Sequence, residues 1–194
     1  TLDFGIQLET IYSKITDEYF WVHPRAGLLP GNPPTVVLAL QKYYRVDDGD
    51  DFFGPVHEMR TQDLGKTWIG PIDHDAALNE YRWKWKEGTR TVICDFTPGW
   101  HPATGKLLGI GHTVIYGDNS HVPLVRTTVI PRNTAYSVYD EATHTWSEFE
   151  LLEIPDKSFY NSGSGCSQRV DLPNGDVLLP TYVMHPDLMP DGGV

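Results

Sequence analysis

Arg25 is the residue of this sequence whose position most clearly calls for a chemical explanation. It lies within the apolar run from Tyr19 to Pro30, and a charged side chain on an apolar strand needs either a buried partner or a ligand. A guanidinium group can bind a carboxylate through two parallel hydrogen bonds. Arg25 is therefore a candidate anion-binding residue, with a structural ion pair as the alternative.

A cluster of four carboxylates follows Arg25. Asp48 and Asp50 lie 23 and 25 residues after it, flanked by Asp47 and Asp51. Neighbouring negative charges raise the pKa of a carboxyl group, as a general acid requires. Acidic loops that contain glycine also bind calcium, and others are simply solvated. The loop could thus supply a carboxyl group with a raised pKa, bind calcium through all four carboxylates, or be a solvated turn.

The elements that must position these side chains are predicted to be short strands. Six Trp, ten Tyr and seven Phe, together with eighteen Gly and fifteen Pro, are typical of strands joined by turns and favour an all-β domain. The predicted strands fall into three groups, which comprise residues 19–30, 35–40, 54–60 and 67–70, then 91–96, 106–116 and 134–139, and finally a group that begins at residue 163.

A tight turn is predicted between the third and fourth strands. Residues 61–68 have the pattern (Ser/Thr)-x-Asp-x-Gly-x-Thr-Trp, carried by Thr61, Asp63, Gly65, Thr67 and Trp68. The Asp carboxylate can accept backbone N–H groups of the turn, and Gly tolerates a positive φ. The Thr is expected to open the next strand, and the Trp ring to pack between neighbouring sheets.

This pattern resembles the Asp box, the turn motif repeated in the β-propellers of the sialidase (neuraminidase) family. Residues 139–146 resemble a degenerate second copy, in which Thr145 and Trp146 keep their register and Asp140 stands one residue early. Residues 163–180 are similar to a family strand pair with Gly-x-Gly before it and Asn174-Gly175, a strong hairpin turn, at its tip. The resemblance covers about residues 19–182.

The resemblance implies a propeller of four-stranded antiparallel blades, of which the family has six. About two and a half blades are expected here: blade 1 at about residues 17–75, blade 2 at about 90–154 and the start of blade 3 at about 163–194. Residues 1–16 could form a closing strand. The chain therefore looks like the N-terminal part of the fold, with the other blades on a missing or separate segment.

The resemblance also implies a glycoside hydrolase that removes a terminal acidic sugar, most simply sialic acid, from a glycan. Arg25 would bind the sugar carboxylate, and Asp48 or Asp50 would protonate the leaving group. The family's other two arginines, its Glu and its Tyr nucleophile belong to later blades, so the catalytic set is incomplete in this chain. Family members of this kind are secreted or periplasmic, whereas the first residues here lack signal-peptide features.

Two other functions remain open. Related propellers include polysaccharide lyases, which need a base and a group that neutralises the uronate carboxylate. In this chain those roles could fall to His101 or His112, with Tyr160 and with Arg169 or Arg25. Hydrogen-bonded packing is the alternative for each side chain. A non-catalytic propeller would instead bind glycan or protein. The alternating aromatic and basic residues 82–86 are predicted to form an exposed edge strand, or a sugar-stacking platform.

Composition narrows the choice of partners. The 194 residues carry a net charge of −11, which argues against binding to nucleic acid or to an anionic lipid surface. No apolar run is long enough to span a membrane. Cys94 and Cys166 are the two cysteines, both expected to be buried, and no Cys/His spacing indicates a bound metal.

Overall fold

The computed structural model describes residues 4–6, 8–45, 52–78, 89–117, 132–156, 159, 161–166 and 168–183. These residues form antiparallel β-sheets and a four-residue helix, α1 (Asp75–Leu78). The all-β class predicted from the sequence is therefore confirmed.

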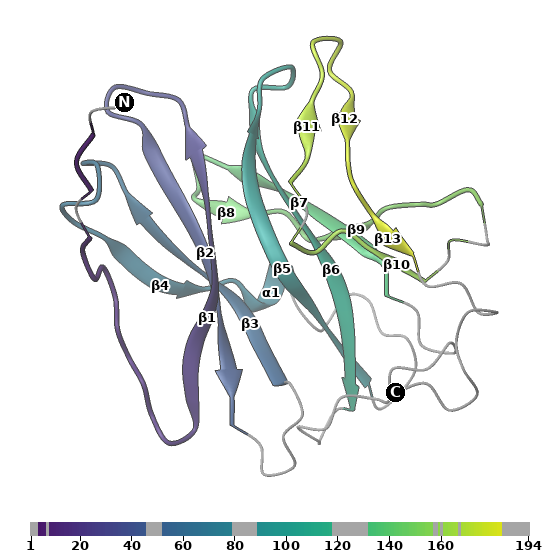
Figure 1. The fold of residues 1–194 in the computed structure, drawn as a ribbon, viewed down its shortest axis with the longest axis horizontal. Coiled ribbons are helices and arrows are strands. Elements are labelled where there is room, and N and C mark those ends of the chain that lie inside the picture. Colours follow the sequence, from purple (N-terminus) through teal and green to yellow (C-terminus); the bar gives the residue numbers. More distant parts are fainter. Residues whose placement is uncertain are drawn as a thin grey trace.

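The first sheet contains four strands in sequence order. They are β1 (Tyr19–Leu29), β2 (Thr35–Tyr44), β3 (Phe52–Thr61) and β4 (Ile69–Asp73), each antiparallel to the next. Residues 35–40 at the start of β2 are almost wholly apolar and rich in β-branched residues, as suits a strand with both faces covered. The predicted strands of this group all form, and the sheet holds β1 at one edge (Figure 1).

The second sheet repeats the same order. It contains β5 (Thr89–His101), β6 (Lys106–Gly117), β7 (Thr134–Asp140) and β8 (Thr145–Trp146), and a short strand, β9 (Glu150–Leu151), also pairs with β7. β5 and β6 form a long hairpin, and β5 occupies the edge that β1 occupies in the first sheet.

The third unit consists of two strand pairs. β10 (Ser162–Gly163) pairs with β13 (Tyr182–Val183), and β11 (Val170–Asp171) pairs with β12 (Val177–Leu178). The hairpin turn lies at Asn174-Gly175 as predicted. Of these two residues only Gly175 has a positive φ, of 91°, because the Asn174 side chain instead accepts a hydrogen bond from the Asp176 N–H at 3.1 Å.

The hydrophobic core lies between the first and second sheets, which face one another. The closest approach is between β1 and β5, where a Cβ on Gly27 would lie 2.8 Å from Cβ of Pro98. Only glycine fits there, so the two edge strands run side by side (Figure 1). The buried side chains of this core include Leu29, Val37 and Val56 of the first sheet and Ile93, Phe96, Leu107, Tyr139 and Trp146 of the second.

The third unit packs against the opposite face of the second sheet. Pro98 faces the first sheet at Gly27, and successive residues of a strand point to opposite faces. A Cβ on the next residue, Gly99, would lie 3.2 Å from Nη2 of Arg169 in the third unit. The second sheet is therefore enclosed between the other two units.

The Asp box forms the expected turn. The Asp63 carboxylate accepts hydrogen bonds from the Thr67 N–H at 2.9 Å and the Thr67 hydroxyl at 2.7 Å. The Thr61 hydroxyl donates to Asp63 at 2.9 Å and accepts from the Gly65 N–H at 2.9 Å. Gly65 has a φ of 89°, as predicted. The following strand, β4, begins at Ile69, two residues later than the motif suggested.

The Asp63 carboxylate should make stability depend on pH. Its hydrogen bonds, first the one from the Thr67 hydroxyl, lower its pKa from 3.8 to about 2. A carboxyl whose pKa is lower in the folded state stabilises the fold above the unfolded pKa and loses that contribution as pH falls through the folded pKa. We expect Asp63→Asn to melt a few degrees below wild type at pH 7, with the difference narrowing between about pH 4 and pH 2.

Thermal unfolding followed by circular dichroism at several pH values tests this expectation. Asp17→Asn, which changes an exposed carboxylate outside the turn, is the matched control and should leave the melting temperature unchanged. An equal deficit for Asp63→Asn at pH 7 and at pH 2 would contradict the assigned hydrogen bonds.

The second copy of the motif keeps its turn but uses its Trp differently. The Asp140 carboxylate accepts hydrogen bonds from the Ala142 N–H at 2.8 Å and the Thr143 N–H at 3.4 Å, and these two bonds lower the pKa of Asp140. Trp146 is 5% exposed and fills the space between the sheets. The expectation that Trp68 does so is wrong: it is only half-buried, and its indole N–H donates to the Gly65 carbonyl of its own turn at 3.1 Å.

The described residues before Tyr19 form no strand, so a closing strand at residues 1–16 stays a prediction. Phe4, Ile6 and Leu8 are 70%, 77% and 90% exposed.

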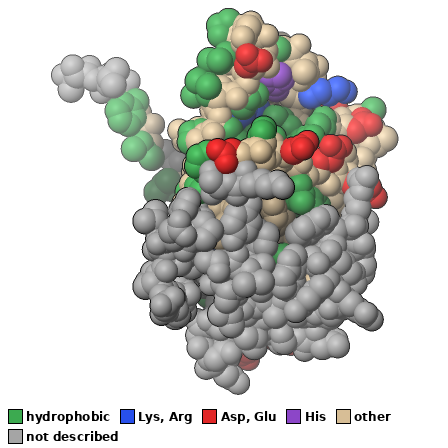
Figure 2. Space-filling view, turned by 90° about the vertical axis from the view of Figure 1, so that its right-hand side faces the viewer, with side chains coloured by type: hydrophobic (Ala, Val, Ile, Leu, Met, Phe, Trp, Pro, Cys, Tyr) green, Lys and Arg blue, Asp and Glu red, His purple; other side chains and the backbone are tan. Residues whose placement is uncertain are grey.

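Acidic side chains lie at several places on the described upper part of the face in Figure 2, in keeping with the net charge of −11. In the part of the chain that the structure describes, no helix has the length and apolar character needed to cross a membrane.

Candidate functional site

Arg25 meets a carboxylate and a thiol from the two other units. Its Nη2 lies 3.2 Å from Oδ1 of Asp95 on β5 and 3.4 Å from Sγ of Cys166 in the third unit. Nδ1 of His23 lies 3.5 Å from the same Asp95 oxygen. We call these four residues the Arg25 cluster. Each unit of the fold contributes to it.

The backbone is irregular where these residues meet. The register of β1 against β2 shifts between Val22 and Arg25, and that of β5 against β6 shifts between Cys94 and Thr97. Such bulges redirect side chains and are common beside active sites.

Three members of the cluster also have left-handed backbones. The φ angles are 53° at His23, 54° at Asp95 and 61° at Cys166. Non-glycine residues rarely adopt this conformation, and they concentrate at functional sites because the surrounding structure must hold them there. The strain here is shared by three segments that are remote in sequence.

These three residues occupy equivalent places in successive units. They are separated by 72 and 71 residues, and His23 and Asp95 each lie in the bulge of an edge strand. The irregularity therefore repeats with the fold, and the three copies converge at one place. A repeat that brings one residue per unit to a common point is a geometry suited to building a site from distant segments.

The cluster is accessible and can bind an anion. The side chains of Arg25 and His23 are 30% and 28% exposed, whereas that of Asp95 is 13% exposed. Nη2 donates to the Asp95 carboxylate and Nη1 donates to the Pro24 carbonyl at 3.4 Å. A guanidinium has five N–H groups, so others remain able to donate to a ligand. A bound carboxylate is the simplest partner for such a group.

The position of Cys166 differs from the sequence-based expectation. Cys94 is buried as predicted, but Cys166 is exposed, because the left-handed turn places it at the cluster and not in the core. Partial burial raises the pKa of the Cys166 thiol, and the Asp95 carboxylate adds to this effect, while Arg25 opposes it. The thiol is therefore mostly protonated at neutral pH.

Alkylation of Cys166 tests this arrangement. In Asp95→Asn the carboxylate that raises the thiol pKa is gone, while Arg25, which lowers it, remains. Because the thiolate is the reactive species, we expect iodoacetamide to modify Cys166 several-fold faster than in wild type at pH 7.5. Mass spectrometry of the labelled peptide measures the rate, with buried Cys94 as an internal reference.

Asp176→Asn, which alters an exposed turn carboxylate, serves as the matched control and should react at the wild-type rate. An unchanged or slower rate in folded Asp95→Asn would show that Asp95 does not act on the thiol.

Two of the residues considered for a lyase make structural contacts. His101 lies six residues beyond Asp95 on β5, about 20 Å away at about 3.3 Å per residue, and its ring bonds the Thr104 hydroxyl at 2.8 Å and the Gly175 carbonyl at 3.1 Å. Arg169 donates to the carbonyls of Gly99 and Leu108 at 2.6 and 2.7 Å. These bonds tie the third unit to the second sheet.

His112 also lies against the third unit. Its ring is 6.1 Å from that of Tyr182, and a Cβ on Gly165, next to Cys166, would lie 1.9 Å from its Nδ1. The Tyr182 hydroxyl accepts a hydrogen bond from Arg132 at 3.2 Å. His112 thus lies behind the turn that carries Cys166 and helps to shape that turn.

Several predicted residues lie outside the described residues. These are the proton-donor candidates Asp48 and Asp50, the other two carboxylates of the possible calcium site, Asp47 and Asp51, and Tyr160. Residues 82–86 also lie outside. Within the described ranges, no group of three or more His, Cys, Asp or Glu side chains is arranged to hold a metal ion.

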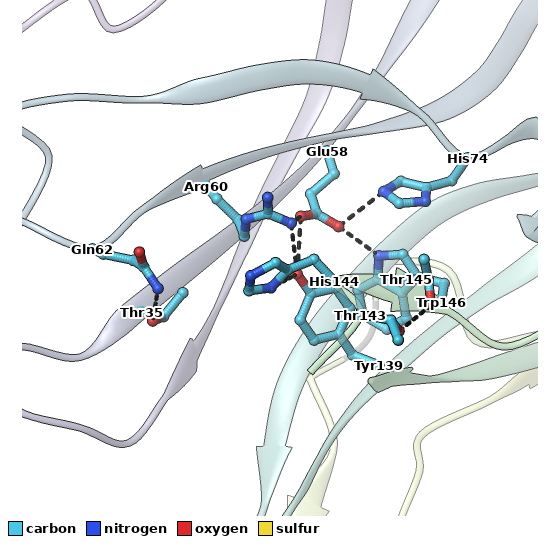
Figure 3. A network of polar contacts seen from close by, with 10 residues as sticks. All are labelled: Thr35, Glu58, Arg60, Gln62, His74, Tyr139, Thr143, His144, Thr145 and Trp146. Carbon is cyan, nitrogen blue, oxygen red and sulfur yellow. Dashed lines mark hydrogen bonds and ion pairs between the residues drawn. The ribbon is translucent and has the colours of Figure 1, made fainter. Parts of the chain in front are cut away.

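A second polar cluster is buried between the sheets (Figure 3). Glu58, whose side chain is 1% exposed, accepts hydrogen bonds from Arg60 at 3.0 Å and Tyr139 at 3.1 Å through Oε1. Its Oε2 accepts from the Trp146 indole at 3.1 Å and lies 2.9 Å from Nε2 of His74. Burial, reinforced by Glu58, raises the pKa of Tyr139 to about 12. Both carboxylate oxygens are occupied, so this cluster is a clamp between the sheets.

Sequence reasoning missed Asp95 and Glu58. Glu58 and Arg60 stand two residues apart on a predicted strand, and this signal could have indicated a paired charge on the buried face. Asp95 gives no comparable local signal, because its partner Arg25 lies 70 residues away.

Comparison with known proteins adds no assignment: no protein-family model matches the chain, and no curated protein matches it significantly.

Proposed function

We propose that this chain is part of a sialidase-type β-propeller that hydrolyses a terminal acidic sugar, most simply sialic acid, from glycans. The proposal rests chiefly on the Arg25 cluster, in which equivalent, strained positions of three successive units meet around an accessible guanidinium. A propeller gathers one residue from the inner strand of each blade around its axis, and this arrangement would account for that meeting.

The way the units stack also supports a propeller. A two-layer sandwich buries one face of each sheet, whereas each blade of a propeller is covered on both faces by its neighbours. The second sheet has the first sheet on one face, at Gly27, and the third unit on the other, at Arg169. The strand order also repeats, with the edge strand β1 beside the edge strand β5.

Within this proposal, Arg25 binds the carboxylate of the acidic sugar. Contacts of Nη2 with Asp95 at 3.2 Å and of Nη1 with the Pro24 carbonyl at 3.4 Å limit the orientations of the guanidinium, which reduces the entropy lost when a carboxylate binds. His23 lies beside the same carboxylate and stacks on Phe53, with ring centroids 4.9 Å apart.

Asp48 or Asp50 donates the proton to the leaving group. Asp50 precedes Phe53 by only three residues in the sequence, and Phe53 lies against His23 of the Arg25 cluster. The neighbouring carboxylates of the loop would favour the protonated form that a general acid needs.

The test is the product released by the protein that carries this chain, expressed from its complete coding sequence. With a fluorogenic α-sialoside, hydrolysis should release free sialic acid and the fluorophore. With a polyuronate, a lyase would instead generate an unsaturated product that absorbs in the ultraviolet. Turnover of the polyuronate, or of neither compound by folded protein, would overturn the proposal in favour of a lyase or of a non-catalytic binding propeller, respectively.

A further inference from the structure

Arg132 lies where the second sheet and the third unit meet, and its backbone joins the two. The Arg132 N–H donates to the Asn161 side chain at 3.0 Å, and the Arg132 carbonyl accepts the Ser162 N–H at 3.0 Å. Asn161 and Ser162 are 7% and 1% exposed. The position of Arg132 is therefore fixed by backbone hydrogen bonds, which any residue except proline could make.

The guanidinium of Arg132 is held by a tyrosine. Its Nη1 donates to the Tyr182 hydroxyl at 3.2 Å, and this hydrogen bond is exposed. The hydroxyl lies over Gly163 of β10, where a Cβ would approach it to 2.5 Å. Only glycine leaves room for the hydroxyl at this place. We call Arg132 and Tyr182 the Arg132 pair.

Arg132 differs from Arg169, which also lies at this junction, in what its guanidinium contacts. Arg169 donates to two carbonyls and to Asp171, and its side chain is 9% exposed. Arg132 donates to a neutral hydroxyl, and among the described residues no carboxylate pairs with it. The guanidinium of Arg169 is thus fully used within the fold, whereas that of Arg132 keeps N–H groups for a ligand.

Arg132 also emerges at the end of the fold that carries the proposed proton donor. Arg25 on β1 meets Asp95 on β5. Two residues further along β1, Gly27 meets Pro98, so the two strands run in the same direction. The β2–β3 and β6–β7 connections therefore leave their sheets at the same end, where β1 and β5 begin. The proposed proton donor belongs to the first connection, and Arg132 stands two residues before β7.

The Arg132 pair lies beyond the Arg25 cluster in that direction. Cys166 occupies the place in the third unit that His23 occupies in β1, so residues before Cys166 lie toward the same end. Gly163, beneath the Tyr182 hydroxyl, stands three residues before Cys166, which is at most about 11 Å along the chain. A glycan held by the cluster would pass the pair as it leaves the site.

The pair lies on the face of the third unit that is turned toward the second sheet. The Tyr182 ring is 6.1 Å from that of His112 on β6, and β10 lies beside β6 (Figure 1). A further blade would pack on the opposite face of the third unit and would leave the pair uncovered. Tyr182 is 44% exposed, so a ligand can reach it.

We propose that the Arg132 pair forms a subsite for a second carboxylate of the glycan, next to the sugar whose carboxylate Arg25 binds. Arg132 binds this second carboxylate, and Tyr182 holds the guanidinium and can donate its own hydroxyl hydrogen to the same group. The identity of the first sugar rests on the proposed function. The inferred substrate class is a glycan in which the terminal acidic sugar is linked to another acidic sugar.

Binding of two sulfur-linked analogues, which resist hydrolysis, tests this subsite in the protein expressed from its complete coding sequence. One is an α-linked disialoside with two carboxylates, and the other is a sialyl-galactoside with one. In isothermal titration the wild type should bind the disialoside about tenfold more tightly, by a difference that narrows as salt rises. Arg132→Ala should weaken binding of the disialoside about tenfold, or about 1.4 kcal/mol, and leave the affinity for the sialyl-galactoside unchanged.

Tyr182→Phe removes the hydroxyl and keeps the ring, so it should lose part of the preference for the disialoside. Two variants are matched controls that should keep the wild-type preference. Lys66→Ala removes an exposed cation from the turn between β3 and β4, at the opposite end of the first sheet. Tyr136→Phe removes a hydroxyl that bonds Glu150. Circular dichroism verifies that each variant is folded.

Three results would overturn the subsite: equal binding of the two compounds by the wild type, binding of neither by folded protein, or equal weakening of both by Arg132→Ala. Turnover of the fluorogenic sialoside separates such a failure from failure of the proposed function. A wild type that hydrolyses the sialoside without preferring the disialoside keeps the activity and loses the subsite. One that prefers the disialoside through Arg132 without hydrolysing the sialoside keeps the subsite and loses the activity.

Discussion

Replacement of Arg25 by alanine is expected to lower kcat/KM toward a fluorogenic α-sialoside by about 100-fold or more. Removal of one partner from a charged, hydrogen-bonded pair costs about 2–5 kcal/mol, and each 1.4 kcal/mol changes a rate or binding constant about tenfold. The side chain is 30% exposed and fixed by Asp95 at 3.2 Å, so it is free to bind a ligand but not to move far. The loss should come mainly from KM, because the sugar carboxylate is charged in both substrate and transition state.

Two variants separate a binding role from a general effect of charge. Arg25→Lys keeps the charge but loses the planar pair of donors, and we expect an intermediate loss. Lys106→Ala removes a cation from an exposed position distant from the cluster and should retain wild-type activity. Steady-state kinetics on folded proteins measures all three. If Arg25→Ala kept the wild-type KM, Arg25 would not be the residue that binds the substrate carboxylate.

Replacement of Glu58 by alanine should destabilise the fold by about 3–5 kcal/mol, the cost of breaking a buried ion pair by removing one partner. The change leaves Arg60 as a buried cation and deprives the Tyr139 hydroxyl and the Trp146 indole of their acceptor. A domain of ordinary stability has about 5–15 kcal/mol in total. The variant is therefore expected to unfold at a much lower denaturant concentration than wild type.

Urea unfolding monitored by tryptophan fluorescence measures this loss. Glu58→Gln keeps the size of the side chain and one acceptor oxygen, so it should lose less stability than Glu58→Ala. Glu141→Ala changes an exposed carboxylate in the turn between β7 and β8 and should unfold like wild type. A loss below about 1 kcal/mol for Glu58→Ala, the range of an exposed ion pair, would show that the network does not clamp the sheets.

Local features of the fold were predictable from sequence because they depend on residues that are close in the chain. The Asp63 turn requires an acceptor, a residue that tolerates positive φ, and a hydroxyl within a few positions, and all three are visible in residues 61–68. The hairpin at Asn174-Gly175 is similarly local, as are the apolar runs that became β1, β2 and β5. Trp68 shows the limit of local prediction. The motif predicted the turn correctly, whereas the burial of the Trp68 ring depends on which segment of the fold lies opposite it.

Only part of the Arg25 cluster could be predicted from the sequence. Arg25 stood out as a charge in an apolar run, and either a partner or a ligand was expected. Its partner Asp95 lies 70 residues away, and Cys166, expected in the core, joined it at the surface. These pairings depend on two bulges that shift the strand register, and a shift of one residue turns side chains to the other face.

The sequence by itself determined the strands, their turns and their antiparallel order, because backbone propensity and turn hydrogen bonds act between near neighbours. Only the tertiary structure decided which charges meet. It paired Arg25 with Asp95 and surrounded the Glu58 carboxylate with partners from two sheets. The physical reason is that contacts between sheets are set by register, bulges and the stacking of whole units, none of which is written in any short stretch of the chain.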